Sequence, residues 1–137
     1  MKLRIGRVLA GTMTLAAATI MATAGNASAG QLPPAPSGGW DHHWHGTGVD
    51  VYVEEHGDMI YVCDTSANGH SAWVAADDIT LNISGYKQTV TTGAGTCTGH
   101  DASDGAKYDL AEGSRISLNY DGVGTNGEYV TSFVNDH

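Results

Sequence analysis

"VDVYVEEHGDMIYVCD", residues 49–64, contains the clearest structural pattern in the chain. Apolar residues occupy every second position from Val49 to Val53, as in a β-strand with one buried face. A tight turn at residues 56–58 separates this strand from an apolar return strand that ends near Asp64. The stretch therefore predicts a β-hairpin.

Further short strands are predicted along the rest of the chain. Asn68-Gly69 is typical of a hairpin turn. Residues 93–113 lack a regular pattern and predict a glycine-rich acidic loop with a short helical turn near Lys107–Leu110. The predicted strands cover residues 71–76, 78–84 (with Ile79, Leu81 and Ile83 on one face), 86–92, 115–120 and 128–134. About seven short strands separated by turns predict an all-β fold, a single small β-sandwich of immunoglobulin-like or related type over residues 49–137.

The first 29 residues have the parts of a secretory signal peptide. A basic start is followed by an uncharged stretch of apolar and small residues at 8–25, and Ala-Ser-Ala at 27–29 fits a signal peptidase site. We expect cleavage after Ala29 and secretion of the mature chain, which would then have no membrane association. A membrane anchor is the alternative reading of the same stretch.

The predicted cleavage makes the chain strongly acidic. Three of the six basic residues lie within residues 1–29 and all 15 acidic residues lie beyond it, so the mature net charge would be −12 with histidine neutral. Nucleic acid is therefore excluded as a partner, because lysine and arginine supply most of the affinity for phosphates. The charge would instead attract cations or a basic partner.

The chain has two cysteines, Cys63 and Cys97. In a secreted protein an even pair predicts a disulfide, and neither cysteine belongs to a C-x-x-C motif. The alternative is a pair of free thiols. A bond closing a loop of about 35 residues would stabilise the fold by roughly 4 kcal/mol on chain entropy alone.

Residues 30–48 contain all three prolines and predict a flexible leader before the folded domain. Within it, "WDHHWHG" at 40–46 has three histidines and an aspartate. In an extended conformation Asp41, His43 and His45 lie on one side, and His42 lies on the other with the tryptophans. Imidazole and carboxylate are ligands for Zn²⁺, Cu²⁺ or Ni²⁺, so these four residues predict a weak metal site. Two alternatives are a solvated histidine-rich tail and an edge strand that packs its tryptophans against the sheet.

A second candidate cation site lies in the acidic loop. Asp101, Asp104, Asp109 and Glu112 have part of the spacing of a calcium loop, but the required glycine is misplaced. Weak Ca²⁺ binding is one reading of this segment, and a solvated acidic loop is the other.

The hairpin region resembles a group of small exported actinobacterial proteins of uncharacterised function. The matching features are Gly57, Val62-Cys63-Asp64, Asn68-Gly69-His70, Cys97 and Gly113 before "RISLNY". This resemblance implies a single-disulfide β-domain and export, and it implies no catalytic residue.

These patterns favour a secreted, monomeric, non-enzymatic binding module for an extracellular protein or a glycan. A glycan-binding module needs exposed aromatic side chains, for which the candidates are Tyr52, Tyr61, Trp73, Tyr86 and Tyr129. The first alternative is an extracytoplasmic transition-metal binder that uses the leader histidines. The second is a small secreted hydrolase, for which the sequence offers no G-x-S-x-G motif.

Overall fold

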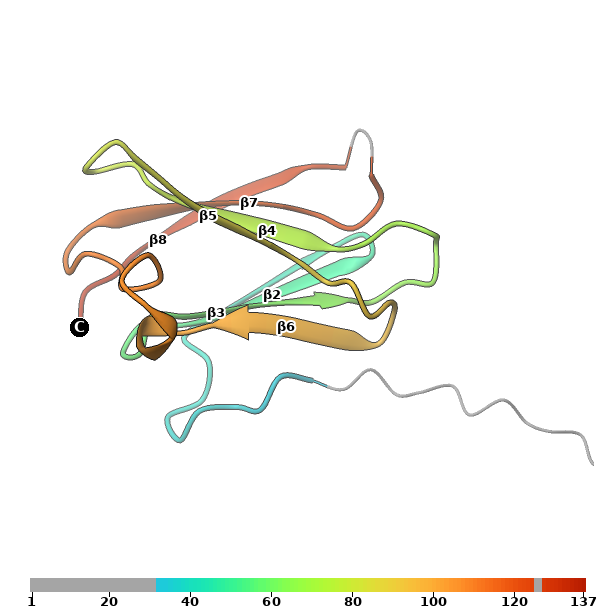
Figure 1. Ribbon diagram of the computed structural model, residues 1–137, viewed down its shortest axis with the longest axis horizontal. Helices are drawn as coiled ribbons and strands as arrows, with labels where there is room; N and C mark the ends of the chain where they lie inside the picture. The colour runs from blue at the N-terminus through green and yellow to red at the C-terminus, as the bar shows by residue number, and fades with distance from the viewer. Residues whose placement is uncertain (1–31, 125–126) are drawn as a thin grey trace, which may run out of the picture.

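Two antiparallel sheets of four strands each pack face to face in the computed structural model (Figure 1). The structure describes residues 32–124 and 127–137, so the predicted signal peptide lies outside the described residues. Sheet A has the order β1-β2-β3-β6 and sheet B the order β5-β4-β7-β8. The strands are β1 (His42–Gly46), β2 (Val49–Glu54), β3 (Met59–Asp64), β4 (Trp73–Asp78), β5 (Ile83–Thr89), β6 (Thr96–His100), β7 (Arg115–Asp121) and β8 (Tyr129–Val134). The predicted β-sandwich is confirmed.

The core forms where the inward faces of the two sheets meet. In the β2–β3 hairpin, Val53 is opposite Ile60 and Val51 is opposite Val62, so the alternating valines of β2 all face inward. Burial of these apolar faces supplies most of the driving force for folding. The buried hydrophobic cluster comprises Val49, Val51, Val53, Ile60, Val62, Ala72, Val74, Ala76, Val90, Ile116, Leu118, Tyr120 and Phe133.

The Asn68-Gly69 turn does not form a hairpin, so that prediction is wrong. The loop between β3 and β4 instead crosses from sheet A to sheet B. The Asn68 side-chain amide donates a hydrogen bond of 2.8 Å to the carbonyl of Gly122, at the end of β7. A turn sequence fixes the local backbone but not the sheet that the next strand joins.

The predicted strand over residues 78–84 is also wrong. Residues 79–82 form the turn between β4 and β5, where Asp78 accepts hydrogen bonds from the N–H groups of Thr80 and Leu81. Ile79, Leu81 and Ile83, expected on one buried face, are 53%, 53% and 54% exposed. Their alternation therefore falls on the exposed turn between β4 and β5 and on the first residue of β5.

The predicted loop over residues 93–113 contains a strand, β6, that pairs with β3. Cys63 and Cys97 are directly opposite each other in this pairing and form the predicted disulfide, with Cα atoms 4.0 Å apart. The bond therefore joins two strands of sheet A and does not connect the two sheets. The helical turn expected near Lys107–Leu110 lies earlier, as a 3₁₀ helix at Ala102–Asp104. Among the described residues, no helix is long and apolar enough to span a bilayer.

The segment predicted as a leader contains β1, so the folded domain begins before Val49. The two-residue turn Thr47-Gly48 returns β1 onto β2, and β1 becomes an edge strand of sheet A. Gly48 has a φ of +74° and lies so close to the backbone of Gly122 that an added Cβ would be 2.7 Å from its carbonyl oxygen. Only glycine fits this close approach with a positive φ.

A buried polar network joins the β2–β3 turn to the segment after β8. Asn135 is fully buried, and its amide donates hydrogen bonds to Asp58 (2.9 Å) and to the carbonyl of Leu110 (3.2 Å). The second carboxylate oxygen of Asp58 accepts a hydrogen bond from the N–H of Leu110. Burial raises the pKa of Asp58, while the bonds from Leu110 and Asn135 oppose that shift. The network connects three segments far apart in the sequence.

Candidate functional site

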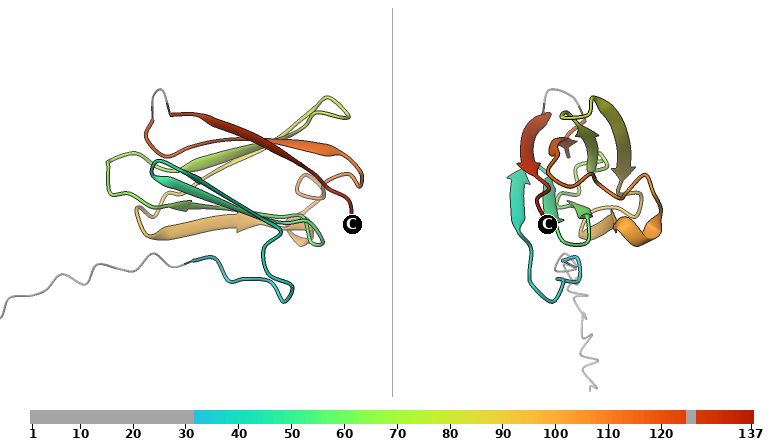
Figure 2. Two further views of the ribbon diagram at one scale, coloured as in Figure 1. Left: turned by 180° about the vertical axis from the view of Figure 1, so that it is seen from behind. Right: turned by 90° about the vertical axis from the view of Figure 1, so that its left-hand side faces the viewer.

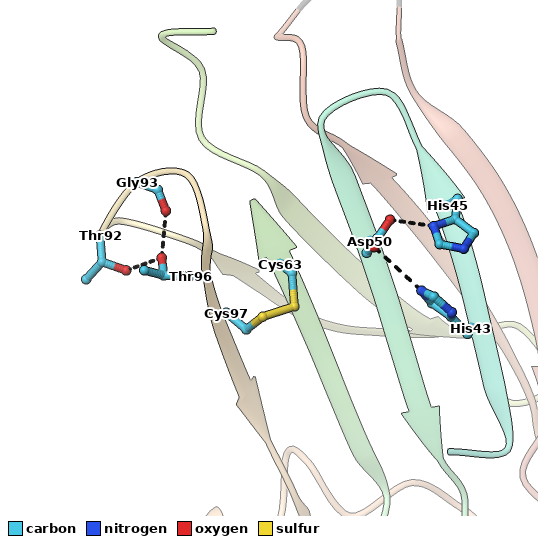
Figure 3. Close-up of a disulfide and its surroundings, with 8 residues drawn as sticks. All are labelled: His43, His45, Asp50, Cys63, Thr92, Gly93, Thr96 and Cys97. Atoms are coloured by element: carbon cyan, nitrogen blue, oxygen red, sulfur yellow. Dashed lines mark hydrogen bonds and ion pairs between the residues drawn. A yellow bond between two sulfur atoms is a disulfide. The ribbon is translucent and has the colours of Figure 1, made fainter. Parts of the chain in front are cut away.

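His43, His45 and Asp50 come together on the outer face of sheet A. The register of the β1–β2 hairpin places His45 opposite Asp50 and His43 opposite Tyr52. Strand alternation then directs the three polar side chains away from the core (Figure 3). One ligand atom from each of these residues lies within 4.8 Å of the ligand atoms of the other two.

The Asp50 carboxylate lies between the two imidazoles. Its Oδ1 is 2.8 Å from Nδ1 of His45, and its Oδ2 is 3.6 Å from Nε2 of His43. The two imidazole rings are 4.0 Å apart between centroids. A tetrahedral zinc ion with bonds of about 2.0–2.1 Å holds its ligand atoms about 3.3 Å apart, so small side-chain rotations would complete the geometry.

Tyr52 contacts two members of this group, His43 and Asp50. Its ring stacks on His43 at 4.0 Å with an interplanar angle of 14°. Burial, followed by the charge of Asp50 and a hydrogen bond to it, raises the pKa of the Tyr52 hydroxyl, which therefore stays protonated and donates to the carboxylate. Outer-shell contacts of this kind orient metal ligands and raise affinity.

The disulfide lies in the same row of the sheet as the candidate site. His45 is opposite Asp50, Asp50 is opposite Cys63, and Cys63 is opposite Cys97. Figure 3 shows the side chains of His43, His45 and Asp50 and the disulfide on adjacent strands of one sheet. The disulfide thereby holds β3 and β6 together in the sheet that contains Asp50.

Two of the four residues predicted for the metal site belong to this group, and two do not. Asp41 precedes β1, and its carboxylate accepts a hydrogen bond of 2.9 Å from the N–H of Glu55, which extends the β1–β2 pairing. His42 faces the interior, where its ring stacks on Trp44. Asp50 replaces Asp41 in the group; the glycine of Thr47-Gly48 was the sequence signal for the hairpin turn that brings Asp50 there.

The structure does not gather the predicted calcium-loop residues around one point. Asp101 caps the 3₁₀ helix, and Asp104 pairs with Nδ1 of His100 at 2.9 Å. Within residues 32–124 and 127–137, the groups of three or more histidine, cysteine or acidic side chains that could hold one ion include none of Asp101, Asp104, Asp109 and Glu112.

The aromatic residues considered for glycan binding do not form an exposed platform. Trp40 covers two of them, with ring centroids 5.6 Å from Tyr52 and 5.7 Å from Tyr61. The ammonium group of Lys87 lies 3.5 Å above the ring of Trp73. The large hydrophobic side chains that are exposed are all aliphatic within the described chain: Leu32, Ile79, Leu81, Ile83 and Val130.

No protein-family model, curated protein or solved structure matches this chain. The resemblance to small exported actinobacterial proteins stays a prediction.

Proposed function

We propose that this protein is an exported module that binds a transition-metal ion at His43, His45 and Asp50. The observation that carries the proposal is the convergence of two imidazoles and one carboxylate, from paired strands, to within 4.8 Å. A site on a rigid hairpin loses less conformational entropy on binding than a site on a mobile tail. This removes the main reason for expecting only weak binding.

The ligand set and its position favour Zn²⁺, Cu²⁺ or Ni²⁺. Two imidazole nitrogens suit these borderline ions, and one carboxylate is compatible with each of them. The His45 side chain is 71% exposed, so solvent or a donor group from a partner can reach the remaining coordination positions. Such an open site is suited to acquiring or passing on an ion, whereas purely structural zinc sites are closed by four protein ligands.

Export agrees with two features of the chain. The predicted signal peptide would remove half of the basic residues and leave a mature charge that attracts cations. The disulfide is of the kind that persists in oxidising compartments.

Titration of Zn²⁺ and Cu²⁺ into the mature protein tests the proposal. We expect His43→Ala, His45→Ala and Asp50→Asn each to weaken binding by about tenfold or more, because loss of even an outer-shell partner typically weakens metal binding by about 10- to 100-fold. Asp41→Asn is the matched control, because Asp41 has the same side-chain chemistry and lies outside the group. Equal losses in Asp41→Asn and Asp50→Asn, or no loss in the histidine variants, would contradict the proposal.

One observation favours a second function, the binding of a protein partner. The tip of the β4–β5 hairpin exposes Ile79, Leu81 and Ile83, and two of these line a shallow pocket together with Leu110. The expected result is a defined complex with an extracellular protein that the Leu81→Ser/Ile83→Ser variant cannot form. The small-hydrolase alternative stays a prediction.

A further inference from the structure

The opposite side of β1 carries a second cluster of histidine and carboxylate groups. His42 faces inward at the edge of the sandwich, stacked on Trp44 at 5.0 Å and 5.4 Å from the ring of Phe133 in β8. β1 and β8 lie along the same side of the two sheets (Figure 2). His42 is thereby held in place, with its Nε2 2.5 Å from Oε1 of Glu55.

Glu55 is the centre of this cluster. It follows β2 directly and is only 7% exposed. Its second oxygen, Oε2, is 3.2 Å from Nδ1 of His137. The carboxylate of Asp136 is 4.0 Å from that same nitrogen, and the ring of His56 is 4.5 Å from the ring of His137. The ligand atoms of Glu55, Asp136 and His137 all lie within 4.8 Å of one another.

Two carboxylates, one of them nearly buried, lie in this cluster with no lysine or arginine paired to them among the residues that the structure describes. Burial of a carboxylate is costly unless it is paired. In the described part of the chain, the ion pairs of Glu55 are with His42 and His137, and neither lysine nor arginine takes part in any of the ion pairs found.

We propose that Glu55, Asp136 and His137 form a second divalent-metal site. An ion here would neutralise two carboxylates and join residues that follow β8 to the end of β2. Two oxygen ligands and one nitrogen ligand make this site richer in oxygen than the His43–His45–Asp50 group, and Zn²⁺ accepts both sets. The proposal does not depend on the proposed function, because the two groups share no residue and lie on opposite sides of β1.

Zn²⁺ titration followed by the imidazole ¹H–¹⁵N resonances tests this site. The experiment uses the mature protein with His43→Ala and His45→Ala, which removes the first group. We expect one equivalent of Zn²⁺ to shift the Nδ1 resonance of His137 while His70, which belongs to neither group, stays unchanged. Adding His137→Ala should abolish this equivalent, and Asp136→Asn should weaken it by about tenfold or more.

Asp136 and His137 are exposed, so their substitution should not disturb folding. Glu55 is buried, so circular dichroism must show that Glu55→Gln is folded. His70→Ala is the matched control. The proposal is overturned if the His137 resonance does not move at millimolar Zn²⁺. It is also overturned if adding Asp136→Asn or Glu55→Gln leaves the Zn²⁺-induced shift of His137 unchanged, because His137 would then bind the ion without its neighbours. If the His43→Ala/His45→Ala protein binds no Zn²⁺ although the wild-type protein does, this second site is overturned and the proposed function stays intact. If Zn²⁺ binding is lost in His137→Ala but kept in His43→Ala/His45→Ala, the second site stands and the proposed function is overturned.

Discussion

Replacing both cysteines, as Cys63→Ala/Cys97→Ala, should lower the free energy of unfolding by about 4 kcal/mol. The magnitude follows from the 34-residue separation of the bonded cysteines, whose cross-link restricts the unfolded chain. Removing both sulfur atoms avoids a lone thiol. The folded state should keep its topology, because β6 still has five residues in register with β3.

The position of β6 determines where the destabilisation appears. β6 is an edge strand that pairs only with β3, and its inward positions include two threonines and no aliphatic residue. Without the bond, β6 should detach in a local opening before the rest of the sandwich unfolds. We therefore expect the amides of residues 96–100 to lose more hydrogen-exchange protection than those of β7.

Urea denaturation of the oxidised protein, the reduced protein and the double variant measures the effect. With an m-value of about 2 kcal/mol/M, a loss of about 4 kcal/mol lowers the midpoint by roughly 2 M. The reduced wild type and the double variant should agree. A loss below about 1 kcal/mol, or unchanged protection of β6, would refute the view that the cross-link supplies what this strand lacks in apolar contacts.

Four further outcomes are expected. Gly99→Ala should cost about 1–3 kcal/mol in thermal melts, because its Cβ would lie 2.3 Å from Cγ of Tyr61, whereas Gly38→Ala, with no atom within 4 Å, should change stability by less than about 0.5 kcal/mol. Tyr129→Phe should cost about 1 kcal/mol, measured by urea unfolding, because the hydroxyl bonds both the N–H and the Oγ1 of Thr47 at 3.0 Å. Because burial raises the pKa of Asp58, its contribution to stability should be greatest below the ordinary aspartate pKa of about 3.9 and should fall as pH rises through the pKa in the folded state. The urea midpoint of the wild type should therefore fall relative to that of Asp58→Asn as pH rises across the acidic range, and parallel curves would contradict this expectation. Zn²⁺ affinity should fall on acidification, because imidazole must be neutral to ligate, and calorimetry that gave equal affinities at about pH 7.5 and 5.5 would contradict histidine ligation.

Alternation predicted the strands whose inward faces are aliphatic. β2 places valine at every second position, and β7 places Ile116, Leu118 and Tyr120 there; burial of these side chains fixes both the strand and its inward face. β6 has the sequence Thr-Cys-Thr-Gly-His, which contains no such signal, and it is a strand because β3 offers a free edge and a disulfide partner. The alternating aliphatic residues near Leu81 mark a hairpin tip, which shows that alternation does not itself require burial.

Of the candidate site, His43 and His45 could be predicted from the sequence and Asp50 could not. Alternation alone places His43 and His45 on one face, since it depends only on neighbours within the strand. The carboxylate that joins them depends on the register with β2, which the Thr47-Gly48 turn sets. The second group required the residues after β8 to return beside Glu55, and no local pattern encodes a contact over that separation.

The hydrogen bond from Asn135 to Asp58 spans 77 residues, and this affects the order of events in folding. The β2–β3 hairpin and its strained turn at Asp58, where φ is +54°, can form early from nearby residues. The buried carboxylate then lacks its side-chain partner until Asn135 has been synthesised and β8 has docked. During synthesis the partly made sandwich would therefore keep an open end, with one side of its sheets lacking a neighbour, which is the kind of intermediate that chaperones recognise. Closing this end is a late step, so variants of Asn135 should mainly speed unfolding, because contacts formed after the transition state contribute little to the folding rate.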